Sequence, residues 1–221
     1  MRGKFIVFEG IDASGKDTQF DLLKDRLNKE GISTIFTKEP TDNKIGKLIR
    51  EEYLSGKDNS DKRIISLLMA ADRLDHISNS EYGILQYLEK GYNVISNRYI
   101  LSSYAYDGTF NGYNFVCDIN RMAKNLLTAD ITIYIDIDPK IAFERINTNR
   151  DKKEIYENLK TLEEVRESYL DLINFDSVNK KLYGDCYIIE GNDTIENIHN
   201  KIWDIVYNNT KEGFTNEIIT R

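Results

Sequence analysis

The chain has 221 residues, of which 40% are hydrophobic and 30% are charged, and its formal net charge at pH 7 is −7. This hydrophobic fraction excludes a fully disordered chain, and the acidic balance argues against a broad nucleic-acid-binding face. No apolar run approaches the roughly 20 residues of a membrane span, and the two cysteines lie far apart at no metal-binding spacing. We therefore expect a cytoplasmic protein with free thiols and no nucleic-acid or membrane partner.

Short apolar runs, typical of strands buried on both faces, alternate with stretches whose apolar residues recur at helical spacing. In chain order the predicted strands are Lys4–Phe8, Thr34–Thr37, Asn93–Ser96, Ile131–Ile135 and Cys186–Ile189. The predicted helices are Thr18–Glu30, Lys62–His76, Ile84–Lys90, Phe115–Leu127, Pro139–Asn147, Tyr156–Ile173 and Thr194–Tyr207. This alternation predicts one α/β domain over residues 1–221, with a parallel sheet covered by helices. Residues 208–221 lack clear periodicity and are expected to pack loosely.

A glycine-rich segment directly follows the first predicted strand and opens the first predicted helix. It reads Gly10-Ile11-Asp12-Ala13-Ser14-Gly15-Lys16-Asp17-Thr18 and fits the pattern G-x-x-x-x-G-K. In such a loop the backbone N–H groups turn inward around a phosphate, and the lysine reaches the outer phosphates. The sequence therefore predicts a phosphate-binding loop.

Asp17 departs from the usual form of this loop, which has a serine or threonine that ligates Mg²⁺ at that position. A carboxylate repels phosphates unless a metal ion lies between them. One interpretation is that Asp17 complements the helix N-terminus while Thr18 supplies a hydroxyl. The other is that Asp17 itself binds the metal.

Further segments show a resemblance to a known family. The first are Phe8–Asp12 with Gly15–Gln19, and Thr37–Thr41 followed by Ile45–Arg50. The others are Leu67–Arg73, Asn97–Tyr99 with Ser102–Tyr106, and Tyr134–Pro139 with Glu144–Ile146. Together these pieces resemble the thymidylate kinases. They occur in the order that this family has, and the resemblance covers about residues 4–205.

The resemblance implies a P-loop kinase with a five-stranded parallel sheet flanked by helices on both faces, usually as a homodimer. A short lid would span about residues 145–157. The implied activity is γ-phosphoryl transfer from Mg·ATP to dTMP, which gives dTDP and ADP, so the partners are small nucleotides. Phosphoryl transfer depends on positioning and charge neutralisation, and it needs no covalent nucleophile.

The resemblance also assigns roles to individual residues. Lys16, Arg98 and Arg150 would be catalytic, with Arg150 replacing an arginine that the family carries within the stretch aligned to Glu154–Glu157. The ATP site would comprise Gly10, Ile11, Asp12, Ala13, Ser14, Gly15, Lys16, Asp17, Thr18 and Arg145. The substrate site would comprise Asp12, Glu39, Pro40, Arg50, Met69, Arg73, Arg98, Ser103, Tyr106 and Asp107.

Within this substrate site, Arg98 and Arg50 would grip the acceptor phosphate, and Arg73 would donate to O4 of thymine. Asp12 would bind the 3′-hydroxyl and Tyr106 would lie against the sugar. Without the motif, Asp72 and Arg73 could equally form a surface charge cluster.

Four site positions differ from the common pattern of the family: Asp17, Met69, Asn97 and Asp107. One carboxylate is absent at Asn97 and one is gained at Asp17, so the charge around Mg²⁺ is unchanged, and Asp17 is the predicted metal ligand. Two alternatives to dTMP phosphorylation stay open. One is a deoxynucleoside monophosphate kinase that prefers another base, in dGMP or dUMP, and the other is a nucleotide-binding protein without turnover.

Overall fold

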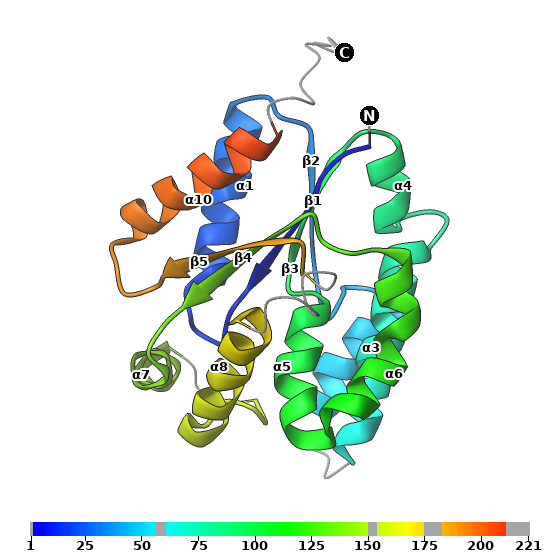
Figure 1. Ribbon diagram of the computed structural model, residues 1–221, viewed down its shortest axis with the longest axis vertical. Coiled ribbons are helices and arrows are strands. Elements are labelled where there is room, and N and C mark those ends of the chain that lie inside the picture. Colours follow the sequence, from blue (N-terminus) through cyan, green and yellow to red (C-terminus); the bar gives the residue numbers. More distant parts are fainter. Residues whose placement is uncertain (1, 56–60, 150–153, 175–182, 211–221) are drawn as a thin grey trace.

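The computed structural model describes residues 2–55, 61–149, 154–174 and 183–210 (Figure 1). Five strands form one sheet in the order β2-β3-β1-β4-β5, and every neighbouring pair is parallel. The strands are β1 (Phe5–Glu9), β2 (Thr34–Lys38), β3 (Asn93–Asn97), β4 (Ile131–Asp136) and β5 (Asp185–Glu190). All five predicted strands and the predicted parallel sheet are therefore confirmed.

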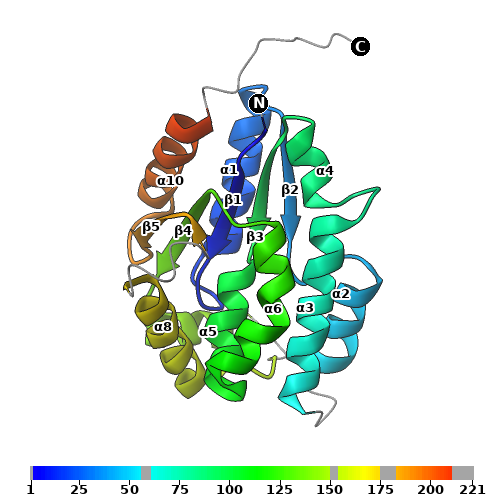
Figure 2. The same ribbon diagram turned by 45° about the vertical axis from the view of Figure 1, so that its right-hand side comes forward.

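Helices cover both faces of the sheet (Figures 1 and 2). On one face lie α1 (Lys16–Lys29) and α10 (Ile195–Thr210). On the other lie α3 (Lys62–Ser78), α4 (Ile84–Glu89), α5 (Ile100–Asn111), α6 (Tyr113–Leu126), α7 (Pro139–Asn149) and α8 (Leu159–Asn174). A short α2 (Lys44–Leu48) continues into the π-helix η1 (Ile49–Leu54).

The strand β1 shows why the sheet needs helices on both sides. All five of its residues are buried, and successive side chains point to opposite faces. Phe5 and Val7 join the core under α3 to α8, whereas Ile6 and Phe8 join the core under α1 and α10. The phosphate loop follows the carboxyl end of β1, and Arg98 follows the carboxyl end of β3. This packing fixes the positions of these two strand ends relative to each other.

Several details differ from the prediction, and one is that the predicted helices did not include α2 and η1. Helix α5 was not predicted, because its residues 100–107 are all buried and the helix has no polar face that would produce a helical period. Helix α8 begins at Leu159 rather than Tyr156, since residues 154–158 form turns. Helix α10 continues to Thr210, whose side chain is buried, so a loose tail beginning at residue 208 was wrong. Residues 211–221 lie outside the described residues.

No helix in the described ranges is both long enough and apolar enough to span a membrane.

Candidate active site

The phosphate loop joins β1 to α1 and adopts a backbone that only certain residues tolerate. Gly10 has φ +152°, and a Cβ there would lie 2.8 Å from the carbonyl oxygen of Ile135, so the first glycine of the motif is required. Gly15 is left-handed, and among the described residues a Cβ there would meet only Arg145, at 3.8 Å. Space for a phosphate therefore remains beside the start of α1. Arg145 also donates to the Ala13 carbonyl at 3.2 Å, which supports its predicted place in the ATP site.

The lysine of this loop is buried. Lys16 is 3% exposed, and its Nζ lies 3.9 Å from the Asp12 carboxylate. Burial lowers the pKa of the Lys16 ammonium, and the positive charge of Arg98 lowers it further. Two cations thus face one small volume next to the loop, which is an arrangement suited to an anion.

Arg98 follows β3 directly and brings three predicted site residues together. Its φ is +72°, and its backbone N–H donates to Phe8 at 2.8 Å. The guanidinium donates to Asp12 at 2.5 Å and to the hydroxyl of Tyr106 at 3.3 Å. The side chain is 14% exposed. Asp12, Arg98 and Tyr106, predicted to bind one nucleotide, therefore form one cluster at the carboxyl edge of the sheet, where open α/β sheets bind ligands.

Glu9 supports this cluster and was not among the predicted site residues. It is fully buried at the end of β1 and accepts from the backbone N–H groups of Tyr99 and Ser102, at 3.0 and 3.1 Å. The hydroxyls of Ser102 and Tyr169 also donate to it, at 2.5 and 2.9 Å. Burial raises the pKa of Glu9. The sequence did contain an indication of this role, because Glu9 ends an otherwise apolar strand. A glutamate in such a place can be buried only where N–H or hydroxyl groups donate hydrogen bonds to its carboxylate.

Arg73 is fully buried, and all five of its N–H groups face protein acceptors. Nε and Nη2 reach one oxygen of Glu39 at 2.9 and 2.8 Å, and Nη2 also reaches the Tyr99 carbonyl at 3.2 Å. Nη1 donates to Ser103 Oγ at 2.9 Å and to Asn120 Oδ1 at 2.5 Å. A donor for thymine O4 would have to leave one of these partners, so this role of Arg73 stays a prediction.

The alternative of an Asp72/Arg73 surface charge cluster is wrong. Asp72 is 1% exposed, and both of its oxygens accept from Thr41, at 2.7 Å from the backbone N–H and 2.6 Å from the hydroxyl. The two neighbouring residues therefore serve separate buried networks.

Asp107 lies next to this network. The hydroxyls of Ser66 and Ser103 hydrogen-bond its carboxyl group, which is almost fully buried. Burial raises the pKa of Asp107 to about 6. Met69, the other altered base-side position, is half-buried and packs against the core. Ser103 thus bridges Arg73 and Asp107, and the polar groups predicted to surround the base are linked.

The raised pKa of Asp107 gives a prediction about stability. An acid whose pKa is raised by folding favours the folded state below its unfolded pKa of about 3.9, and this contribution is lost as the pH rises through 6. Asp107→Asn should therefore raise the free energy of unfolding by about 3 kcal/mol at pH 7.5 and leave it nearly unchanged at pH 4. Urea unfolding at the two pH values measures this. Equal effects at both would contradict a raised pKa.

Arg50 contacts the loop that follows β2. Arg50, on η1, donates to the Pro40 carbonyl at 2.5 Å and to Asp42 at 3.0 Å. Its guanidinium therefore supports the loop after β2, and a grip on the acceptor phosphate stays a prediction. Arg150 lies outside the described residues.

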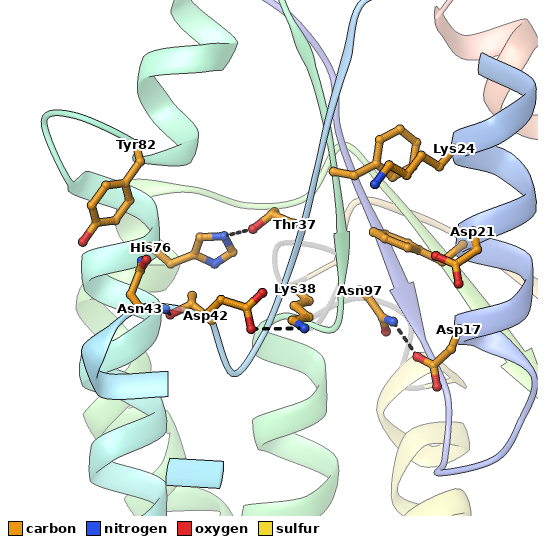
Figure 3. Close-up of a pocket in the computed structure, with 13 residues that line it drawn as sticks. Asp17, Asp21, Lys24, Thr37, Lys38, Asp42, Asn43, His76, Tyr82 and Asn97 are labelled. Atoms are coloured by element: carbon orange, nitrogen blue, oxygen red, sulfur yellow. Dashed lines mark hydrogen bonds and ion pairs between the residues drawn. The ribbon is translucent and has the colours of Figure 1, made fainter. Parts of the chain in front are cut away.

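Asp17 and Asn97, the two altered metal-side positions, are in direct contact (Figure 3). Asn97 Nδ2 donates to Asp17 Oδ1 at 2.6 Å. The positive charge of Lys16 lowers the pKa of Asp17, and this hydrogen bond lowers it further. Asn97 Oδ1 is buried, and among the described residues it has no hydrogen-bond partner. An ionised carboxylate and an orphaned amide oxygen at the phosphate loop fit Mg²⁺, which takes hard oxygen ligands and few of them from the protein.

The same pair lies at one end of a cleft of about 460 Å³ beside the edge strand β2 (Figure 3). The other end is lined by His76 and Tyr82, near Thr37 of β2. The side chains of Asp17 and Asn97 therefore line this cleft, although Asn97 Oδ1 itself is buried. Within the described part of the chain, no three His, Cys, Asp or Glu side chains gather as a metal site of their own.

Comparisons with known proteins agree with this geometry. The sequence pattern of the family described as Thymidylate kinase matches residues 8–202. A protein named probable thymidylate kinase from Methanococcus aeolicus is 40% identical over 200 residues, which cover 90% of this chain and 93% of that protein. Thymidylate kinases from Thermosipho africanus and Caldicellulosiruptor saccharolyticus are 38% and 31% identical and cover 91% and 93% of this chain, and 96% and 97% of their own lengths.

The match extends from the end of β1 to α10, so it contains the phosphate loop, the Arg98 cluster and the Asp107 network. The five-stranded parallel sheet with helices on both faces is the P-loop kinase fold expected from the resemblance. The chain therefore belongs to the thymidylate kinase family.

Proposed function

We propose that this protein transfers the γ-phosphoryl group of ATP to dTMP, giving dTDP and ADP. The observation that carries the proposal is the convergence of Lys16 and Arg98 beside an open phosphate loop, with Asp12 and Tyr106 on the substrate side. Family membership and the names of the relatives give the substrate. Nothing favours another base or a protein without turnover.

The residues of this chain would act by positioning and by neutralising charge. The loop N–H groups and Lys16 would hold the donor phosphates, and Arg145 would approach them from α7. Arg98 would hold the acceptor phosphate near the donor because its fork of N–H groups matches two phosphate oxygens. Asp12, 2.5 Å from Arg98, would accept from the sugar 3′-hydroxyl, with Tyr106 against the sugar.

Mg²⁺ would be held by Asp17, with Asn97 Oδ1 as the second protein oxygen. When bound, the ion supplies positive charge that neutralises the donor phosphates. The task of Asn97 towards Asp17 is to fix the carboxylate through its amide N–H, so that one oxygen is held and the other remains directed at the cleft.

A nucleotide panel tests the proposal. At saturating Mg·ATP, ADP release should be fastest with dTMP, and dCMP should be at least about 10²-fold poorer in kcat/KM. Thymine presents a carbonyl acceptor beside an N–H donor, whereas cytosine presents an amino donor beside a ring-nitrogen acceptor. With cytosine bound, the Ser103 and Asp107 groups that match thymine would therefore be left without hydrogen-bond partners. Turnover of dCMP at the rate of dTMP would contradict this, and ATP turnover with no nucleotide of the panel would contradict the proposal as a whole.

We further propose that the protein is a homodimer. Helices α3 and α6 lie side by side (Figure 2) and expose four large apolar side chains, Ile64, Leu67, Met122 and Leu126. An apolar surface of this kind suits burial against a second copy. Sedimentation at micromolar concentration should give twice the mass of one chain, and a monomer mass would contradict this. A cytoplasmic location is likewise proposed, supported by two thiols that form no disulfide.

A further inference from the structure

We propose that His76 is a positioning residue for the base pocket: through Glu39 it fixes Arg73, and Arg73 fixes the Ser103–Asp107 pair. This inference rests on the proposed function, because it assigns the network a task in binding the base of dTMP. It concerns a histidine that phosphoryl transfer itself does not require and that no motif described above uses.

The chain of contacts begins at the cleft beside β2. His76 comes from α3 and Thr37 from β2, and their side chains face each other with His76 Nε2 2.6 Å from Thr37 Oγ1 (Figure 3). The other ring nitrogen, Nδ1, lies 3.0 Å from Glu39 Oε1. A carboxylate only accepts hydrogen bonds, so Nδ1 carries the proton in this contact. His76 is 3% exposed, so its ring orientation is fixed on both sides.

Glu39 divides its two oxygens between two donors. Oε1 takes His76, and Oε2 takes the Nε and Nη2 groups of Arg73. Its side chain is 1% exposed. Glu39 was predicted to contact the substrate, but both of its oxygens are already used inside the protein. The geometry therefore supports a role for Glu39 in orienting Arg73 rather than in touching the nucleotide.

Arg73 transmits this orientation to the base side. Its Nη1 donates to Ser103 Oγ, so the hydroxyl hydrogen of Ser103 is free to point at Asp107. Loss of the His76 bond would leave Glu39 Oε1 as a buried acceptor without its donor, which costs enough free energy to rotate the carboxylate. Arg73 and Ser103 would then lose their fixed positions. The phosphate loop would keep its position, because it follows β1 and not β2.

Two substitutions of His76 separate the ends of this network. The amide nitrogen of asparagine occupies the place of Nδ1, so His76→Asn keeps a donor towards Glu39 and gives up the contact with Thr37. The amide nitrogen of glutamine occupies the place of Nε2, so His76→Gln keeps the contact with Thr37 and gives up the donor towards Glu39. Thr37→Val removes the Thr37 hydroxyl alone and serves as the matched control.

We expect KM for dTMP to rise only in the variant that loses the hydrogen-bond donor to Glu39. His76→Gln should raise KM for dTMP about 10-fold and leave KM for ATP within about 2-fold. His76→Asn and Thr37→Val should keep KM for dTMP within about 3-fold of the unaltered protein, because the donor to Glu39 is retained. Equal KM changes in the asparagine and glutamine variants would overturn the proposal, as would parallel changes in KM for dTMP and for ATP.

A measurement on the unaltered protein covers the case in which the glutamine variant does not fold. The chain has two histidines, so a long-range ¹H–¹⁵N spectrum contains two rings, and His199→Gln assigns them. Addition of dTMP should shift the Nδ1 signal of His76 and leave His199, which lies on α10 across the sheet, unchanged. No shift at His76 would overturn the proposal.

These outcomes are distinguishable from failure of the proposed function. If the unaltered protein does not phosphorylate dTMP, the function is wrong whatever the variants do. If it does, and the two His76 variants behave alike, only the positioning role is wrong.

Discussion

Replacement of Arg98 by lysine should lower kcat for dTMP phosphorylation by at least about 10³-fold, the scale of an arginine that stabilises a transferring phosphoryl group. Lysine keeps the positive charge between Glu9 and Asp12, so the buried carboxylates retain a counter-ion. It lacks the planar fork that donates to Asp12, Ser102 and Tyr106 at once, and therefore cannot hold two phosphate oxygens in a fixed orientation.

A second arginine provides the control for this substitution. Arg166 forms a two-pronged pair with Asp136, both contacts at 2.7 Å, and lies outside the proposed machinery. Arg166→Lys should leave kcat within about 2-fold while lowering stability by about 1 kcal/mol or less. Rapid-quench measurement of the chemical step distinguishes the two variants. A fall in kcat of less than about 10-fold for Arg98→Lys would remove Arg98 from the transfer step.

Asp17→Asn should weaken Mg²⁺ binding in the presence of ATP by about 10²-fold and lower activity in parallel. The substitution leaves the helix and loop unchanged but removes the ionised oxygen that Lys16 and Asn97 favour. Combining Asp17→Thr with Asn97→Asp should restore much of the Mg²⁺ binding and of the activity. The double variant has a hydroxyl at position 17 and a carboxylate at position 97, so one carboxylate is again available to the metal. Titration with Mn²⁺ followed by electron paramagnetic resonance measures the metal directly, apart from turnover.

The competing interpretation makes Asp17 only a complement to the start of α1. It predicts a loss of about 0.3–1 kcal/mol in stability with nearly normal metal binding. A double-mutant cycle separates the two, since neighbours that share a ligand couple by more than about 0.5 kcal/mol. Asp21→Asn, one turn later on α1 and in the same cleft, is the matched control and should leave Mn²⁺ affinity unchanged. Additive effects of Asp17 and Asn97 substitutions would favour the helix interpretation.

The sheet could be predicted from the sequence because strands buried on both faces are continuous apolar runs, as in Phe5–Phe8. Helix α5 could not be recognised for the same reason, since its first eight residues are all buried and show no polar stripe. The contact between Asp17 and Asn97 was foreseeable, although 80 positions separate them. Asn97 ends β3, and Asp17 lies at the start of α1, directly after the loop that follows the neighbouring parallel strand β1.

The partners of Arg73 could not be predicted. They come from the loop after β2, from two places near α5 and from α6, and no local pattern encodes which acceptors meet one guanidinium. Its complete burial likewise depends on how α3 packs against α5 and α6. A single arginine in an amphipathic helix is compatible with a surface position as well as with a central one.

The enclosure of α5 bears on how this protein could acquire a new base preference. Ser103 and Asp107 each serve at least two neighbours in a buried network, so a substitution there disturbs folding and recognition at once. Met69 is half-buried and unbranched, and it packs on the core through a flexible thioether, which accommodates other shapes. Laboratory selection for a different nucleobase should therefore accumulate its first surviving changes at residue 69 and reach α5 only after compensating changes elsewhere have raised stability.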